Sequence, residues 1–162
     1  MTLPKSDIKF SNGNLGRPPV TKDGTTGIVV TGVAVAGKFA LDEILGPFLS
    51  PLDAVNLGID PDYDSDNKVM AYQHVKDFYD EAPLGTELYL MVTSEDNSME
   101  DICDKDNEYL KKLLRDTGGA IKLAGATRVP PSDYSPVYAD QIDPDVAAAI
   151  TKAKALLNEE AG

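Results

Sequence analysis

The sequence predicts an α/β domain, a mixed sheet with helices packed on it, preceded by an extended N-terminal arm. Apolar runs typical of buried strands alternate with segments of helical period, which indicates a layered sheet with at least partly parallel strands. The first 26 residues differ: one short alternating segment is followed by a stretch rich in Gly, Pro and polar residues. We therefore divide the chain into an arm and linker, residues 1–26, and a core domain, residues 27–162.

The arm opens with a short segment in which polar and apolar side chains alternate, as they do along a strand. Its residues are Asp7, Ile8, Lys9, Phe10 and Ser11. An Asn-Gly turn signal follows, and residues 14–26, with two consecutive prolines, have the composition of an extended linker. The pattern predicts a strand tethered at some distance from the core.

Three apolar runs predict the core strands. Residues 27–35 form a nearly continuous β-branched run, the pattern of a strand that is buried on both faces. Residues 87–92 and 120–125 give the second and third strands. Residues 39–49 are also apolar, but Gly46-Pro47 interrupts them and we assign no strand there.

Helical signals occur at four places. Ser50 is placed to cap a short helix that starts at Pro51 and ends at Gly58. A longer helix is predicted over about residues 67–82, with a stop at Pro83-Leu84-Gly85. Its apolar face comprises Tyr72, Val75, Phe78, Tyr79 and Ala82.

The third predicted helix covers residues 107–116, and the last has Asp143 as its N-cap and Pro144 at its first position. The apolar line of the last helix is Val146, Ile150, Ala153 and Leu157. The acidic run 60–67 and residues 130–142 are predicted to be loops. Because no strand follows the last helix, we expect the domain to be incomplete at its C-terminus or to be completed by another chain.

The composition narrows the possible partners. The 162 residues carry a formal net charge of -12, which argues against direct binding of nucleic acid and against anionic membranes. Cys103 is the single cysteine, which fits a reducing compartment. The N-terminus has no signal-peptide pattern and no run is long enough to span a bilayer, so we expect synthesis in a cytosol.

The sequence offers little catalytic chemistry. His74 is the single histidine and is read as a helix-surface or boundary residue, while the carboxylates around Cys103 are expected to disfavour a reactive thiolate. The run 60–67 fails the calcium-loop pattern in both registers, because the glycine and the closing glutamate are missing. We predict no catalytic residue, no cofactor and no metal site, and expect a protein that is not an enzyme.

Read in order, the segments resemble the N-terminal part of contractile tail sheath proteins from phages and phage-derived particles. The resemblance covers about residues 3–130 and rests on the order and spacing of five segments, none of which is specific alone. They are Leu3–Gly16, Thr26–Ala34, Leu49–Gly58, Val75–Tyr79 and Glu87–Val92. The link Ala82–Gly85 departs from the family, where many members carry paired glycines.

The resemblance implies a structural subunit that assembles into stacked rings around a tail tube, located in a virion tail after assembly in the bacterial cytoplasm. Its partners would be copies of itself, the tail tube protein, and baseplate and tail terminator proteins. Strand exchange between neighbours would involve Asp7, Ile8, Lys9, Phe10 and Ser11; pairing of this segment with its own domain is the alternative. Two other functions stay open, a small intracellular α/β binding module for a basic protein partner and an enzyme with an acid pair.

Overall fold

The computed structural model describes residues 24–138 and 140–160. Their strands are β1 (Thr26–Gly32), β2 (Ile44–Phe48), β3 (Leu88–Ser94) and β4 (Leu123–Ala126). Their helices are α1 (Pro51–Asn56), α2 (Pro61–Asn67), α3 (Ala71–Glu81), α4 (Met99–Cys103), α5 (Leu110–Asp116) and α6 (Pro144–Glu160). The three predicted strands are present with ends that differ by a few residues, and the predicted arm lies almost entirely outside the described residues.

The strands form one mixed sheet in the order β2-β3-β1-β4. Strand β1 pairs in parallel with β3 on one side and with β4 on the other, while β2 runs antiparallel to β3. The predicted α/β class with a mixed sheet is therefore confirmed. Thr26 already belongs to β1, so the core begins slightly before the boundary assigned from the sequence.

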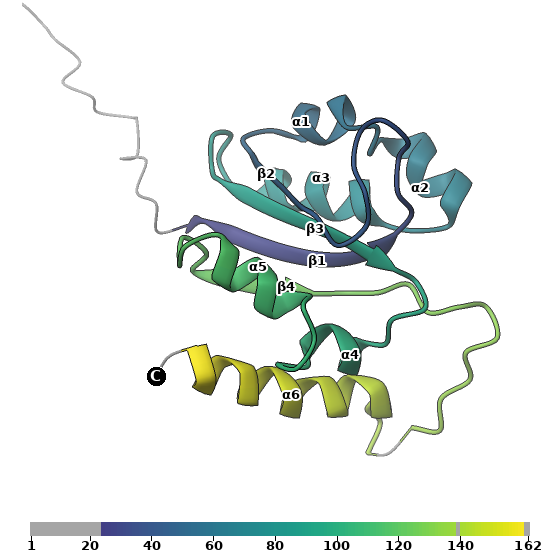
Figure 1. Ribbon diagram of the computed structural model, residues 1–162. Helices are drawn as coiled ribbons and strands as arrows, with labels where there is room; N and C mark the ends of the chain where they lie inside the picture. Colours follow the sequence, from purple (N-terminus) through teal and green to yellow (C-terminus); the bar gives the residue numbers. More distant parts are fainter. Residues whose placement is uncertain (1–23, 139, 161–162) are drawn as a thin grey trace, which may run out of the picture.

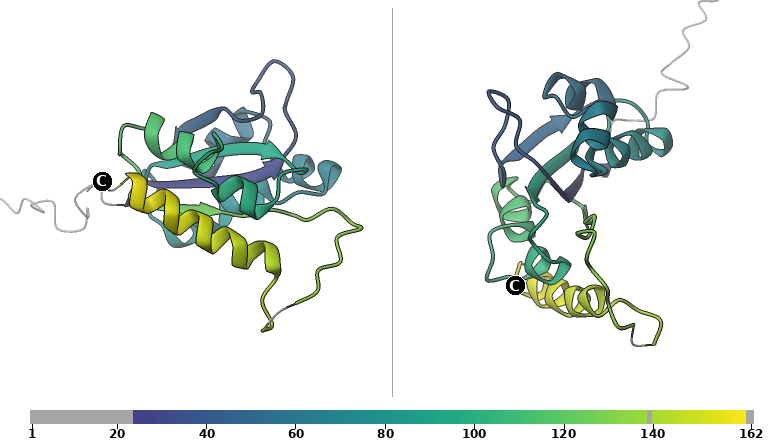
Figure 2. Two further views of the ribbon diagram at one scale, coloured as in Figure 1. Left: turned by 60° about the horizontal axis from the view of Figure 1, so that its bottom comes forward. Right: turned by 90° about the vertical axis from the view of Figure 1, so that its right-hand side faces the viewer.

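Helices cover both faces of the sheet (Figure 1). Helices α1, α2 and α3 lie between β1 and β3 in the chain and pack on one face, and α4, α5 and α6 pack on the other (Figures 1 and 2). The connections from β1 to β3 and from β3 to β4 run in opposite directions across the sheet. Because such crossovers are right-handed, their helices are forced onto opposite faces.

Strand β1 is buried on both sides, as its β-branched composition predicts. Val30 packs into the core with α1–α3, whereas Val29 packs into the core with α4–α6, and both are fully or almost fully buried. Neighbouring β3 divides its side chains in the same way, with Leu90 on the first side and Met91 on the second. Because successive side chains of a strand point to opposite faces of the sheet, each of these strands contributes to two separate cores.

The acidic run 60–67 was predicted to be a loop, and this is wrong. It forms α2, whose N-cap Asp60 accepts a hydrogen bond from the Tyr63 backbone N–H at 2.8 Å. Pro61 occupies the first turn, and acidic side chains are favourable at this end of a helix. Tyr63 anchors the helix in the core, so capping and one buried aromatic residue outweigh the polar composition.

Helix α3 also begins later than predicted. Lys68 adopts a left-handed conformation with φ 56° and ends α2. The Asp64 carboxylate then accepts from the backbone N–H groups of Tyr72 and Gln73 at 3.0 and 2.9 Å, which satisfies donors at the start of α3. One acidic residue of α2 therefore holds the next helix in place.

Two short elements escaped the sequence prediction. Strand β2 contains Gly46-Pro47, which is tolerated because β2 is an edge strand whose pairing with β3 is irregular between Leu45 and Phe48. Helix α4 has only five residues and starts at a capping box formed by Ser98 and Asp101. The prediction for the following helix, α5, started too early by a few residues.

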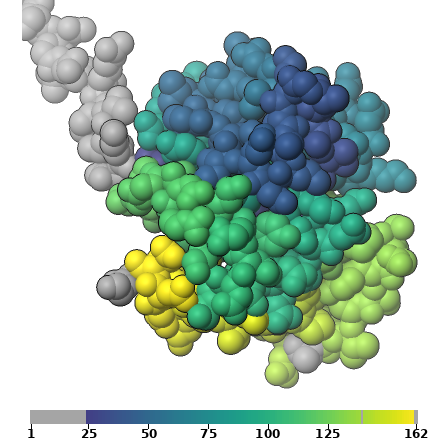
Figure 3. All heavy atoms as spheres, viewed as in Figure 1, coloured from purple at the N-terminus to yellow at the C-terminus, as the bar shows by residue number. Residues whose placement is uncertain are grey.

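The predicted core face of α6 is wrong for three of its four residues. Ala149 and Leu156 are buried and Ala153 packs against the same core, whereas Val146, Ile150 and Leu157 are exposed. Polar contacts between α6 and α4 accompany this orientation, including an ion pair of 2.6 Å between Lys152 and Asp104. Figure 3 shows α6, in yellow, at the lower rim of the molecule, where one side of the helix is open.

The neighbouring residues Leu156 and Leu157 test this orientation. We expect Leu156→Ala to lower the free energy of unfolding by about 2–5 kcal/mol, because the side chain is 0 % exposed and its removal leaves a cavity. Leu157→Ala is the matched control; its side chain is 54 % exposed, and a change below about 0.5 kcal/mol is expected. Urea unfolding measures both, and equal losses would show that the helix is rotated differently.

Candidate functional site

The predicted strand-pairing residues Asp7, Ile8, Lys9, Phe10 and Ser11 lie outside the described residues. The structure therefore does not place the arm. It does show what surfaces the core offers to an added strand.

His74 and Cys103, the two residues considered for catalysis, do not lie together in the fold. His74 is partly buried on α3, on one face of the sheet, while Cys103 is buried in α4 on the other face. Burial raises the pKa of the Cys103 thiol, and the Asp145 carboxylate raises this pKa further. The direction agrees with the sequence prediction, but the main cause is burial rather than the acidic residues adjacent in the chain.

Some of the acidic residues hold the fold together. Asp60, Asp64 and Asp101 accept hydrogen bonds from backbone N–H groups at helix starts. Within residues 24–138 and 140–160, no group of three or more His, Cys, Asp or Glu side chains converges as metal ligands would.

The crevice where doubly wound sheets usually bind small molecules is filled by the protein itself. In such sheets the site lies beyond the carboxyl ends of the strands where the strand order reverses, here β1 and β4. The Tyr63 hydroxyl donates to the Val33 carbonyl at 2.6 Å, and the Val129 N–H donates to the Thr31 hydroxyl at 3.0 Å. A Cβ at Gly32 would lie 2.6 Å from the Tyr63 hydroxyl, so a larger residue there would displace the Tyr63 side chain.

An open groove lies instead between α3 and β4. Its volume is about 460 Å³, and its lining is mainly apolar. The lining residues are Thr26, Ile28, His74, Phe78, Leu123, Ala124, Gly125, Ala126 and Thr127. Ile28 is only partly buried although it lies in the central strand, which shows that the helices on this face do not extend across β4.

The far side of β4 is a free sheet edge. Leu123 and Thr127 donate their backbone N–H groups to the carbonyls of Thr25 and Val29 in β1, at 3.4 and 2.9 Å. Backbone groups alternate in direction along a strand, so the N–H and C=O of Ala124 and Ala126 point away from β1. The described residues place no further strand on that side.

The two edges of the sheet differ in their protection. At the β2 edge, Pro47 lacks an N–H and the register is irregular, and both features hinder pairing with another strand. Strand β4 is short but contains only Leu, Ala and Gly, and Leu123 is 66 % exposed. The open edge and the groove together, which we call the β4 acceptor surface, are the site most suited to binding an extended segment.

Sequence reasoning missed this surface. The strand at residues 120–125 was recognised, but no local signal shows that it lies at an edge, since that depends on which strands pair. The exposure of Leu123, which marks this edge, is visible only in the structure.

The sequence model of one protein family matches residues 3–161 of the chain. The chain belongs to this family, described as DUF2586, N-terminal domain. The match includes the arm as well as the core. No curated protein and no solved structure matches the chain. Among the described helices of this DUF2586 domain, none is long and apolar enough to cross a membrane.

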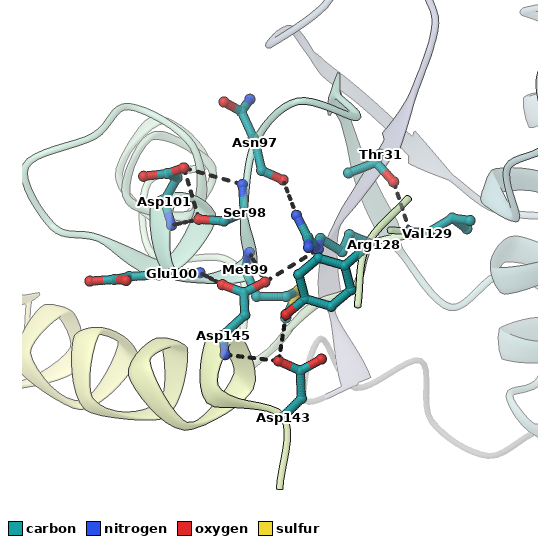
Figure 4. A network of polar contacts seen from close by, with 11 residues as sticks. Thr31, Asn97, Ser98, Met99, Glu100, Asp101, Arg128, Val129, Asp143 and Asp145 are labelled. Atoms are coloured by element: carbon teal, nitrogen blue, oxygen red, sulfur yellow. Dashed lines mark hydrogen bonds and ion pairs between the residues drawn. The ribbon is translucent and has the colours of Figure 1, made fainter. Parts of the chain in front are cut away.

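A polar network holds the second half of the DUF2586 domain together (Figure 4). Asp145, in the first turn of α6, accepts from the backbone N–H groups of Met99 and Glu100 at 2.9 and 3.0 Å, and pairs with Arg128 at 3.2 Å. The Arg128 guanidinium lies 4.7 Å from the centre of the Tyr134 ring. The network therefore joins α4, α6 and the chain that leaves β4.

The same region contains carboxylates with lowered pKa values. A hydrogen bond from the Tyr134 hydroxyl, 2.7 Å long, lowers the pKa of Asp143. The hydrogen bond from Lys152 likewise lowers the pKa of Asp104, and those from Lys105 and Lys111 lower the pKa of Glu159. These contacts connect α6 to neighbouring segments, and they require the carboxyl groups to be ionised.

The role of Asp145 can be tested by Asp145→Asn. We expect the free energy of unfolding to fall by about 1–3 kcal/mol, because the neutral amide loses the ion pair with the nearly buried Arg128 and cannot accept both backbone hydrogen bonds as the carboxylate does. The control is Asp80→Asn, which breaks the exposed pair Lys76–Asp80 and should cost less than about 1 kcal/mol. Chemical denaturation gives both values, and a loss no larger than that of the control would contradict the structural role.

The lowered pKa values predict acid sensitivity. A carboxylate whose pKa is lower in the folded than in the unfolded chain contributes stability above its unfolded pKa, which is about 4. This contribution is lost as the pH falls through the folded pKa. As the pH is lowered from above 4 through the folded pKa values, the melting temperature should fall more steeply for the wild type than for the double variant Asp104→Asn/Asp143→Asn. Parallel curves would show that these acids do not carry the effect.

Proposed function

We propose that this protein is a structural subunit of a contractile tail sheath, which assembles into stacked rings around a tail tube through strand exchange between neighbours. The observation that carries the proposal is the β4 acceptor surface, an unprotected sheet edge beside an apolar groove. A chain that also has a tethered segment of strand period possesses both parts that strand exchange needs. The proposed location is a virion tail or a phage-derived particle.

The arrangement of the core favours a mechanical role over catalysis. The usual ligand crevice of the sheet is filled by Tyr63 and Val129, and His74 and Cys103 lie on opposite faces. A linker between arm and core would let neighbouring subunits change their angle while main-chain pairing persists. The tail tube protein, baseplate proteins and the tail terminator are the further partners that this role implies.

A binding module for a basic protein partner has less support. Such a module would present its acidic residues to the partner, but Asp60, Asp64 and Asp101 accept backbone hydrogen bonds at helix starts of the fold.

Deletion of residues 1–13 tests the proposal. We expect the full chain to form rings or tubes, alone or on a tail tube, and the shortened chain to remain monomeric because it has lost its exchanged strand. Sedimentation velocity and electron microscopy measure assembly, and circular dichroism checks the fold.

A matched pair of variants separates the apolar from the polar side of the segment. Ile8→Asp/Phe10→Asp should prevent assembly, whereas Lys9→Ala/Ser11→Ala should permit it. The proposal is wrong if the full chain stays a compact monomer with and without a tube, or if assembly survives the deletion.

A further inference from the structure

We propose that the β4 acceptor surface binds residues 7–11 of a second copy of this chain, with Ile8 and Phe10 in the groove. This inference rests on the proposed strand exchange and adds where the exchanged strand is received. Four features of the molecule support it.

The first feature is the hydrogen-bonding edge. The outward N–H and C=O groups of Ala124 and Ala126 form the alternating row that an added strand requires. A small apolar ligand in the groove would leave these groups unpaired. An extended peptide satisfies the edge and the groove together.

The second feature is the match between the segment and the groove. Side chains of an added strand alternate between the two faces of the sheet, so Ile8 and Phe10 share one face while Asp7, Lys9 and Ser11 share the other. The groove offers Ile28, Phe78 and Leu123 to the apolar pair.

The floor of the groove also leaves room for large side chains. A Cβ placed on Gly125 would meet no atom within 4 Å. The absence of a side chain there opens space directly beside the β4 edge, where an isoleucine or phenylalanine of the incoming strand would lie.

The third feature is charge. Residues 1–23 contain four basic residues and two acidic ones, a formal charge of +2, within a chain whose total is -12. The remainder therefore carries -14. The basic residues of the arm are Lys5, Lys9, Arg17 and Lys22. Attraction between a positive arm and a negative body favours the approach of the arm to a core domain, while residues 7–11 themselves carry one acid and one base.

The fourth feature is the linker, which favours a second copy over the same one. The described chain starts at Gly24, and the adjacent Thr25 carbonyl accepts hydrogen bonds from Lys122 and Leu123 at the start of β4. A segment returning to its own β4 edge would cross only one strand, a distance of about 10 Å at the usual strand spacing, so it would need only a few residues. The twelve residues between this segment and the described core, 12–23, can reach up to about 40 Å, which is enough to span to a neighbour.

Disulfide trapping in the full-length chain tests the proposal. One batch carries Gly125→Cys, which the open space above Gly125 accommodates. A second batch carries Ile8→Cys or Phe10→Cys, together with a tag that makes its chain longer than that of the first batch. Residues opposite each other on one face of paired strands lie about 5 Å apart, close enough for a disulfide. Cys103 is kept because it is buried, and the wild-type chain shows how much disulfide cross-linking Cys103 gives on its own.

The matched control is Lys9→Cys, whose side chain would point to the opposite face. After mixing and mild oxidation, we expect dimers of unequal length with at least one of Ile8→Cys and Phe10→Cys, about tenfold above Lys9→Cys because of the side-chain alternation. Equal yields for all three positions would overturn the proposed register and groove.

The remaining outcomes separate this inference from the proposed function. A double variant Ile8→Cys/Gly125→Cys that closes a disulfide only within one chain would overturn binding by a second copy. If the wild type forms rings or tubes but no variant cross-links, the acceptor surface is wrong while the sheath role stands. If neither assembly nor cross-linking occurs, with or without a tube, both are wrong.

Discussion

The fold depends on the parallel pairing of β1 with its two neighbours. The register with β3 extends from Thr26↔Leu88 to Gly32↔Ser94 and buries β1 on both faces. Parallel strands cannot be joined by tight turns, so each connection must cross a face of the sheet. The two helical layers and the two cores around Val30 and Val29 follow from this constraint.

The same constraint produces the acceptor surface. The helices α1–α3 bridge β1 and β3, so they cover that half of the sheet and stop short of β4. The chain leaves β4 through a long connection and packs α6 on α4, on the opposite face. The groove beside Phe78 and the free edge at Ala124 and Ala126 are therefore consequences of how the crossovers cover the sheet.

Much of the fold could be read from local signals. The β-branched run of β1, the Ser50-Pro51 start of α1 and the Pro83 stop after α3 each act through backbone chemistry within a few residues. The signals failed where a distant contact decided the outcome. Strand β2 keeps its Gly-Pro pair because β3 supports it from one side, and the face of α6 that carries Leu156 packs on the second core while Asp145 and Lys152 bind α4.

For the proposed strand exchange, the sequence by itself predicts the donor half. Alternation in residues 7–11 marks a segment suited to strand pairing, because side-chain period is a property of adjacent residues. Only the tertiary structure decided the other half: that β4 is an edge, that Pro47 hinders pairing at the opposite edge, and that Gly125 lies at the floor of a groove. Strand order and helix coverage arise from pairing between residues far apart in the chain, which no local pattern encodes.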